Sequence, residues 1–556
     1  MLSDDVSPYA GRWIARIGEQ IVGHGGTPQQ ALSMAQHHRA KEKPLIEFMP
    51  FATPLPFPPI LETIRKLTSG QEIYLVGGAV RDALMGHTTH DLDFIVPSDG
   101  LKIGRELAAR LEAAFFPLDA ERDTARLILV REGRRHVLDI AAFRAPSLEE
   151  DLQDRDFTIN AIAFDIHRNQ LYDPLHGAED VREKRLRLCR PDALQRDPLR
   201  VLRAIRLAAH LGFHILPETR AELRKAAPLL KRVSPERQRD ELFRILEGPQ
   251  VATSLRALDW LGLIELLLPE LIPLKNTRQS PPHIYDVWTH TLTTLQHLEG
   301  LLNLLTQEHD EERAADLLNG LLVLRLGRYR RTFQARMEAQ PVPERSRRSL
   351  LFFAALYHDV AKPLTAQTGE DGRIRFWDHE VRALPLLRSR ATALRLSMDE
   401  IAYLETLVRH HMRIHHQTQA YRARGQLPSR RTVYRFFRDT GEAGIDLILL
   451  TLADLRAVYG HTLPQEVWAA ALDVCRYLLE HRLEHPQESV DPPRLVDGHM
   501  LMEALHLSQG PVIGQLLEAI REAQACGEVH TREQALAFAR NYLEELSRER
   551  EPRDGE

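Results

Sequence analysis

"LVGGAVRDALMGHTTHDLDFIV", residues 75–96, is the stretch that decides the fold of this chain. A short apolar run leads into Gly77 and Gly78, a helix-like segment follows, and Asp91 and Asp93 open a second apolar run. Residues i and i+2 of a strand point to the same face, so we expect the two carboxylates to project together. Such a pair is a hard-oxygen site of the kind that Mg²⁺ prefers. On its own, however, an Asp-x-Asp triplet is most often a surface feature.

The two glycines give this carboxylate pair a context. They stand directly after the apolar run "IYLV" and before the helical start "AVRDALMG". Glycines at such a turn let backbone N–H groups approach a polyphosphate closely, beside the positive end of a helix. A plain strand-to-helix turn is the alternative for the glycines alone. The combination predicts a nucleotide site with a metal beside it.

Composition narrows the class of protein. The 556 residues suggest about three or four domains, and 43% apolar with 27% charged residues is typical of a folded globular chain. No stretch approaches the length of a membrane span, and the three cysteines form no CxxC pair. We therefore expect a cytoplasmic enzyme without a membrane partner or a disulfide framework. The net charge of −5 gives no sign of a nucleic-acid partner.

The apolar pattern changes along the chain. Residues 60–185 mix short β-like runs with helical stretches, whereas beyond about residue 190 apolar residues recur every three or four positions. This predicts an α+β fold class, with a small mixed-sheet head followed by helical parts only. The expected parts are a small module of unknown role with a hairpin and a helix starting at Thr27-Pro28 (1–50), the head (60–185), a neck (186–270), a helical middle (280–484) and a helical tail (490–550).

Taken together, "LVGGAVRDALMG" and "HDLDFIV" resemble the head of the nucleotidyltransferase superfamily, specifically the bacterial-type (class II) tRNA CCA-adding enzymes and poly(A) polymerases. "HVLDIAAFR" is similar to the family's next strand, where Asp139 matches the third metal-site carboxylate. The resemblance implies that Asp91, Asp93 and Asp139 are catalytic and hold a pair of Mg²⁺ ions about 3.5–4 Å apart. At that site a 3′-hydroxyl would displace pyrophosphate from a nucleotide.

Two further segments carry the resemblance toward the nucleotide. "DRDFTINAIAFD" is similar to the ribose-binding segment of the family, and "RDPLRVLRAIRLAAHLGF" resembles its neck, where Asp197 and Arg200 would read the incoming base. An Asp acceptor with an Arg donor can satisfy the pairing edges of both cytosine and adenine. The implied nucleotide-binding residues are Gly77, Gly78, Arg81, Arg155, Asp156, Asn160, Asp197 and Arg200. For Arg81, pairing with Asp82 is the structural alternative.

The chain departs from the family pattern at two of these segments. The family often has a second arginine where this chain has Asp154, and commonly has a glutamate where this chain has Arg196. These departures concern the ribose and template contacts and leave the three carboxylates intact. Farther along the neck, Arg203 and Arg206 fit RNA contacts and a solvated basic helix face equally well.

Histidines and aspartates in the helical middle form a second constellation. His290, His358-Asp359 and Asp454 match the order of the HD phosphohydrolase superfamily, with His379 and either His410 or His411 as ligands of a second ion. Imidazole with carboxylate suits Mn, Fe, Co or Ni, and Mg²⁺ is the alternative. Residues 280–484 would then be an HD phosphohydrolase domain, whose metal ligands are His290, His358, Asp359, His379, His411 and Asp454.

The resemblance implies a template-independent RNA nucleotidyltransferase that adds C and A residues (CCA) to tRNA 3′ ends from CTP and ATP, with pyrophosphate released and with an HD phosphohydrolase activity on RNA ends. An enzyme of the same fold that adds only adenosine is one alternative. Another is a metal-dependent phosphohydrolase with a non-catalytic head, although three intact carboxylates count against it. The sequence indicates no oligomeric state.

Overall fold

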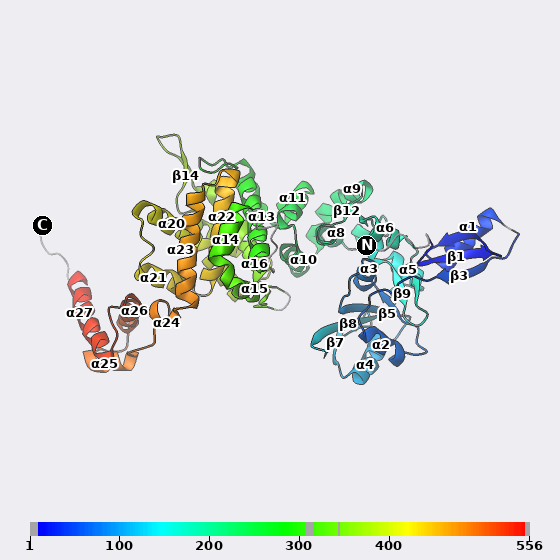
Figure 1. Ribbon diagram of the computed structural model, residues 1–556, viewed down its shortest axis with the longest axis horizontal. Coiled ribbons are helices and arrows are strands. Elements are labelled where there is room, and N and C mark those ends of the chain that lie inside the picture. Colours follow the sequence, from blue (N-terminus) through cyan, green and yellow to red (C-terminus); the bar gives the residue numbers. More distant parts are fainter. Residues whose placement is uncertain (1–8, 40, 307–315, 343–344, 551–556) are drawn as a thin grey trace. The chain divides into compact units, whose positions relative to one another are not determined.

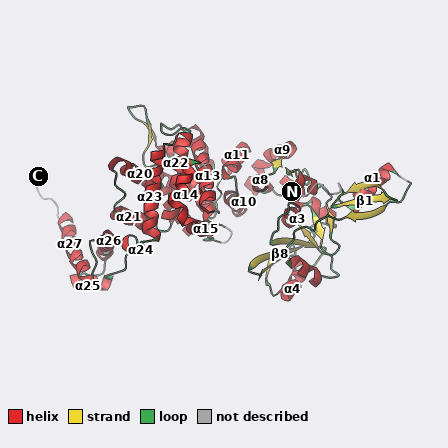
Figure 2. Cartoon of the chain, viewed as in Figure 1, coloured by secondary structure: helices red, strands yellow, loops and turns green. Residues whose placement is uncertain are grey.

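The computed structural model describes residues 9–39, 41–306, 316–342 and 345–550. They form two compact units, Met1–Val233 and Ser234–Glu556. Strands are concentrated in the first unit and helices dominate the second (Figure 2). The predicted α+β class, a mixed-sheet head followed by a largely helical part, is confirmed. The domain boundaries expected from the sequence stay a prediction.

The head is built on a seven-stranded sheet with strand order β10-β9-β4-β5-β8-β7-β6. Strands β5 and β8 pair in parallel, while every other neighbouring pair in this sheet is antiparallel. The chain leaves β5 through helix α4, which packs on β6, β7 and β8, and this crossover lets β8 return beside β5 in the same direction. The strands are β4 (Tyr74–Val76), β5 (Asp91–Val96), β6 (Ala114–Asp119), β7 (Thr124–Arg131), β8 (Arg134–Ala142), β9 (Ala163–Asp165) and β10 (Gln170–Tyr172).

Short helices surround this sheet and lead into the neck (Figure 1). They are α2 (Ile60–Leu67), α3 (Gly78–Leu84), α4 (Gly100–Leu111), α5 (Leu148–Gln153), η1 (Thr158–Asn160), α6 (Gly177–Arg182), α7 (Ala193–Arg196), α8 (Arg200–Leu211), α9 (Pro217–Ala226) and η2 (Ala227–Arg232). A short parallel pair, β11 (Arg185–Leu186) with β12 (His214–Ile215), is an exception to the predicted all-helical neck. The β-like run "TINAIAFDI" divides into η1 and β9, because the Thr158 hydroxyl donates to the buried Asp180 carboxylate at 2.6 Å and fixes a turn there.

The N-terminal module forms a three-stranded antiparallel sheet of order β2-β1-β3 with one helix (Figure 1). Its elements are β1 (Arg12–Ile17), β2 (Gln20–Gly25), α1 (Pro28–His38) and β3 (Leu45–Met49). The predicted hairpin and helix start are confirmed, since the Thr27 side chain accepts a hydrogen bond from Gln30 N at the first turn. Trp13 and Ala31 lie in its small core.

This module packs closely on the head around residues 171–174. Trp13 Nε1 donates to Leu171 O at 2.8 Å, and Asp173 N donates to Gly26 O at 2.8 Å. The Asp173 carboxylate in turn accepts from the first backbone N–H groups of α6. Gly26 approaches so closely that a Cβ there would lie 1.7 Å from Asp173 O. A glycine is therefore required at the contact.

We expect Gly26→Ala to separate the module from the head, because the added methyl group cannot fit against Asp173 O. Limited proteolysis should then cleave the variant faster than the parent within the segment 50–59. The matched control is Gly514→Ala, whose Cβ would have no atom within 4 Å. Equal cleavage of Gly26→Ala and the parent would contradict this docking.

The second unit is helical, apart from a hairpin of β13 (Ala366–Thr368) and β14 (Ile374–Phe376). At its centre α13 packs along the buried helix α22. Its helices are α10 (Pro235–Glu247), α11 (Val251–Trp260), α12 (Leu263–Leu267), η3 (Pro269–Asn276), α13 (Val287–Thr306), α14 (Leu317–Leu326), η4 (Gly327–Tyr329), α15 (Arg330–Glu338), α16 (Arg347–Tyr357), α17 (Lys362–Thr365), α18 (His379–Ala393), α19 (Met398–His410), α20 (Met412–Arg424), α21 (Arg430–Thr440), α22 (Ala443–Tyr459), η5 (Gly460–Thr462), α23 (Gln465–Leu483), α24 (Pro486–Ser489), α25 (Gly498–Leu505), α26 (Pro511–Cys526) and α27 (Arg532–Arg550). Helices α25 to α27 share a core of their own. In the described ranges, no helix combines the length and the apolar character needed to cross a bilayer.

Candidate active sites

The three carboxylates predicted from the sequence meet at one end of the head sheet. Asp91 and Asp93 lie on β5, and the parallel register places Asp139 of β8 directly beside Asp93. Strand β4 pairs its last residue, Val76, with Asp93, so the glycine turn begins at the same edge. Gly77 has φ of 72°, and a Cβ there would lie 3.2 Å from Asp93 Oδ2. The turn must stay free of a side chain for the backbone to pass this carboxylate.

Electrostatics at this edge favour a bound cation. Burial raises the pKa of Asp93, and the negative charges of Asp139 and Asp91 raise it further. The positive charge of Arg155 lowers the same pKa. Arg126 on β7 donates to both oxygens of Asp139 at 2.8 Å, which leaves a further lone pair on each oxygen. Carboxylates that lie this close together are a donor set that fits Mg²⁺.

The ribose-binding segment is held by a network of hydrogen bonds. Asn160 Oδ1 accepts from Arg81 Nη1 at 2.7 Å, and Asn160 Nδ2 donates to Asp156 Oδ1 at 3.1 Å. Arg81 also donates to Asp82 at 2.9 Å, so the alternative pairing with Asp82 is observed, while its nucleotide-binding role stays a prediction. Arg203 Nε lies 2.8 Å from Asp156 Oδ2, and its positive charge helps to lower the pKa of that buried carboxyl despite the cost of burial.

The proposed template arginine is anchored to the backbone of the same segment. Arg200 Nη2 donates to Asp154 O at 2.9 Å, and Arg200 Nη1 donates to Arg155 O at 3.2 Å. Asp197 precedes this helix and accepts a hydrogen bond from Leu199 N. The residues predicted to read the base and those predicted to bind the ribose are therefore connected by hydrogen bonds. Arg206 lies on the same helix, half-buried, and its role stays a prediction.

The two departures from the family pattern contact each other. Arg196 Nη1 donates to Asp154 Oδ1 at 2.5 Å, and Arg190 lies 3.6 Å from the same oxygen. Arg196 also donates to Asp192 at 2.9 Å. Asp154 and Arg196 carry opposite charges and form an ion pair, so the two departures create one attractive contact in this chain. The pair links the end of α7 to the segment that Arg200 touches.

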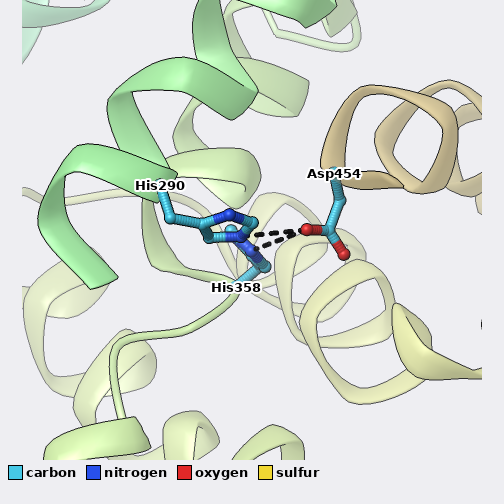
Figure 3. A group of neighbouring side chains, drawn as sticks. All are labelled: His290, His358 and Asp454. Carbon is cyan, nitrogen blue, oxygen red and sulfur yellow. Dashed lines mark ion pairs between the residues drawn. The ribbon is translucent and has the colours of Figure 1, made fainter. Parts of the chain in front are cut away.

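The histidine constellation forms two buried groups in the second unit. The first is His290 of α13, His358 after α16, and Asp454 of α22, with His290 Nε2 2.9 Å from Asp454 Oδ1 (Figure 3). The second group is Asp359, His379 and His411. Asp359 joins them, with Oδ2 3.2 Å from His358 Nε2 and Oδ1 3.3 Å from His379 Nε2. Of the two adjacent histidines left open by the sequence, His411 lies in the group.

The hydrogen bonds of these histidines fix which nitrogen is available to a metal. His358, His379 and His411 each place Nδ1 at 2.7–2.9 Å from a backbone carbonyl. A carbonyl only accepts, so Nδ1 carries a proton and Nε2 is the ring nitrogen that faces inward and can bind a metal. His379 Nε2 and His411 Nε2 then face each other at 3.2 Å. Two lone pairs at that distance repel unless a cation lies between them, so the donor set fits a divalent metal.

Sequence reasoning missed several groups around these sites. Lys362 Nζ lies 2.7 Å from Asp359 Oδ2, and His415 Nε2 lies 2.8 Å from Asp454 Oδ2. The His283 ring lies edge to face with the His290 ring, with 5.5 Å between the ring centres, and burial followed by the charge of Lys362 lowers the pKa of His283 to about 4. The spacing of three between Asp359 and Lys362 was a usable signal. The partners of Arg126 and His415 are set by tertiary structure, so the sequence contained no signal for these two contacts.

A mixed sheet that brings three carboxylates to a glycine turn defines a nucleotidyltransferase. Residues 73–187 match the family model described as "Poly A polymerase head domain", and residues 212–274 match "Probable RNA and SrmB- binding site of polymerase A". The A-adding tRNA nucleotidyltransferase of Deinococcus radiodurans is 34% identical over 85% of this chain and 95% of its own length. The CC-adding tRNA nucleotidyltransferase of Thermus thermophilus is 33% identical over 84% and 93%. The chain belongs to the class II family of tRNA CCA-adding enzymes and poly(A) polymerases.

Other comparisons agree with this assignment. The multifunctional CCA protein of Xanthomonas campestris pv. campestris is 31% identical over 62% of this chain and 76% of its own length. A CCA-adding enzyme solved with CTP has a TM-score of 0.55, covering 88% of this chain and 96% of that one at 20% identity. The Thermotoga maritima CCA-adding enzyme complexed with tRNA has a TM-score of 0.51 at 20% identity, covering 87% and 96%. The two structures establish a shared fold.

The ion pair of Asp154 with Arg196 predicts a charge-swap rescue. Asp154→Arg or Arg196→Glu alone should place like charges together and raise the KM for the nucleotide, because Arg200 is bonded to the backbone at Asp154. The double variant should recover part of the lost affinity, because Arg190 and Asp192 also contact the pair and would meet like charges after the swap. The melting temperature should change little, since an exposed ion pair contributes only about 0–1 kcal/mol. Double and single variants with equal KM would contradict the coupling.

The facing imidazoles predict a metal-dependent stability in the second unit. Saturating Mn²⁺ should raise its melting temperature, since a ligand at 100 times its Kd stabilises by about 2.7 kcal/mol, and a chelator should reverse the shift. His411→Ala should abolish most of the shift because it removes one of the two facing donors. The matched control is His410→Ala, the adjacent histidine outside both groups. A shift that survives His411→Ala, or disappears with His410→Ala, would refute the assignment.

Proposed function

We propose that the protein adds C and A residues to tRNA 3′ ends from CTP and ATP and releases pyrophosphate. The observation that carries the proposal is the parallel register of β5 and β8, which places Asp139 beside Asp93 at the glycine turn. Proteins of the same fold include CCA-adding enzymes solved with CTP and with tRNA, which supports these substrates. The work of each residue follows from its place.

Asp91, Asp93 and Asp139 would hold Mg²⁺, which supplies the positive charge that stabilises an in-line displacement at phosphorus. The narrow turn at Gly77 lets the triphosphate approach the backbone beside the first turn of α3. The 3′-hydroxyl oxygen of the RNA forms the new bond to the α-phosphorus as the bond to pyrophosphate breaks, and the hydroxyl proton leaves to solvent. No covalent intermediate with the enzyme is needed.

The remaining predicted residues would orient the nucleotide. Asn160, fixed by Arg81 and Asp156, is placed to hold the ribose, and Arg155 lies 3.6 Å from the Cβ position of Gly77. Arg200 and Asp197 would present a donor and an acceptor to the base. Because Arg200 is already bonded to backbone carbonyls, its guanidinium has one orientation before the base arrives. Preorganised groups of this kind discriminate between bases at lower entropic cost.

A second candidate is partial addition, of CC alone or of A alone. It is supported by two relatives that align over most of this chain, one A-adding and one CC-adding. Either activity would use the same carboxylates and the same in-line displacement. The two candidates differ in which nucleotides the base-reading residues accept and where addition stops.

We further propose that the histidine groups hydrolyse phosphoesters at RNA ends. The residues fit a divalent metal, which would supply Lewis acidity for attack of water on phosphorus. The attack forms a new P–O bond and releases the alcohol. His290, His358 and Asp454 would bind one ion, and Asp359, His379 and His411 a second, with Asp359 between them. Residues 280–484 would form this HD domain.

Nucleotide incorporation by the purified protein with Mg²⁺ tests the proposal. CTP or ATP is offered to tRNA ending before CCA, to tRNA ending in CC, and to an unstructured RNA. Asp91→Ala and Asp93→Ala should reduce addition by about 10³-fold or more, the scale for losing a preorganised charge at the reacting centre. His358→Ala is the control and should add nucleotides normally while losing phosphodiesterase activity.

Each result assigns a different specificity. Addition of C, C and A in order supports a complete CCA-adding enzyme. Addition that stops after CC, or that occurs only as A on tRNA ending in CC, supports partial addition. Runs of A on the unstructured RNA would instead indicate a poly(A) polymerase. Absence of incorporation on every acceptor, or full activity of Asp93→Ala, would refute the assignment of the carboxylates.

A further inference from the structure

Four large apolar side chains are exposed around the histidine groups of the second unit. Their exposed fractions are 40% for Ile284, 69% for Leu364, 64% for Trp377 and 44% for Val381. Each lies within two residues of a side chain that contacts the groups, namely His283, Lys362 or His379. Exposed apolar residues that gather around a site mark a binding surface more often than singly scattered ones do.

Tertiary contacts place the elements that carry these residues next to one another. Helix α17, which carries Leu364, packs against α18 and β14. Lys362 Nζ lies 5.4 Å from the centre of the Phe376 ring, next to Trp377. Trp377 and Val381 are four residues apart at the start of α18, where His379 points into the buried group. The loop before α13 contacts β14, since Ile374 N donates to Ser280 Oγ at 2.8 Å.

A large exposed indole is the informative member of this set. Tryptophan has the largest flat apolar surface among the side chains, and leaving it in water forgoes the free energy of its burial. Trp377 lies directly before the residue that caps α18 and two residues from a proposed metal ligand. A ligand that places a phosphoester at the metal and a flat ring at Trp377 would bury both ends at once. A nucleotide has this chemistry.

We propose that Trp377, flanked by Leu364 and Val381, is a stacking platform for the nucleobase of the RNA 3′-terminal nucleotide whose phosphoester enters the histidine groups. This rests on the phosphohydrolase function proposed above and names its substrate class. Aromatic stacking accepts every base because each has a flat face, so the platform would be tolerant of sequence. A stable protein interface takes about 20–30 residues from each partner. Three apolar side chains are far fewer, so a nucleobase fits this patch better than a protein partner does.

Intrinsic fluorescence can isolate this residue. All five tryptophans are described, and the other exposed one is Trp260, at 52%. In a Trp260→Phe background we expect adenosine 2′,3′-cyclic phosphate to quench Trp377, and ribose 5-phosphate, which lacks a base, to leave it unchanged. The same titration is repeated with Trp260→Phe/Trp377→Phe, and the difference between the two fluorescence changes is the signal from Trp377. A fluorescence change caused by nucleotide bound at the head occurs in both proteins and cancels.

Hydrolysis of the same cyclic nucleotide supplies the second readout. Trp377→Ala should raise its KM by about 5- to 150-fold with kcat little changed, the range expected for losing one base stack. Trp377→Phe should retain most of the affinity. The matched control is Trp260→Ala, which removes an exposed tryptophan on α11 and should leave KM unchanged.

The outcomes separate the platform from the phosphohydrolase. Base-dependent quenching without hydrolysis would support the platform and refute the phosphohydrolase activity. Hydrolysis with equal KM in Trp377→Ala and the parent would overturn the platform and leave the activity standing. Quenching by ribose 5-phosphate as strong as by the nucleotide would also overturn it. So would a change in oligomeric state with nucleotide affinity unchanged, which would assign the patch to a second copy of the chain.

Discussion

The parallel pairing of β5 with β8 is the constraint on which the head depends. Strand β8 extends beyond the start of β5, and the parallel register places Asp139 beside Asp93, close to the edge where β5 begins. Strand β4 runs the other way and ends at this edge, which brings the turn at Gly77 to the carboxylates. If β8 were antiparallel to β5, the opposite end of β8 would lie at this edge, and Asp139 would pair with a residue other than Asp93. The crossover through α4 therefore determines whether a phosphate turn and a metal site can coincide.

Local patterns predicted much of this architecture, and long-range contacts account for what they missed. The Asp-x-Asp strand, the glycine turn and the start of α1 follow from spacing and capping within a few residues. The division of "TINAIAFDI" into a turn and a strand depends on Asp180, 22 residues away from Thr158. The two hydrogen bonds that Arg126 donates to Asp139 depend on the register of β7 with β8. Periodicity carries no information about either partner.

The pair of Asp154 and Arg196 shows why single positions are poor guides to a site. Each residue taken alone departs from the family pattern, and each gives the other an oppositely charged partner. Together they form an ion pair that spans 42 residues of sequence. An exposed pair contributes little to the free energy of unfolding, so its value lies in orientation. Asp154 also gives its carbonyl to Arg200, which makes the ion pair part of the support for base reading.

The chain carries two donor sets of different chemical character, and this difference argues for two separate chemistries. The head offers carboxylates alone, which favour Mg²⁺ and a polyphosphate. The second unit offers imidazoles whose Nδ1 protons are committed to backbone carbonyls, and such nitrogens bind transition metals more tightly than Mg²⁺. Nucleotide addition builds a phosphodiester and phosphoester hydrolysis breaks one. Under the two functions proposed above, each site would select its ion through the atoms it presents, so metal supply to one reaction need not limit the other.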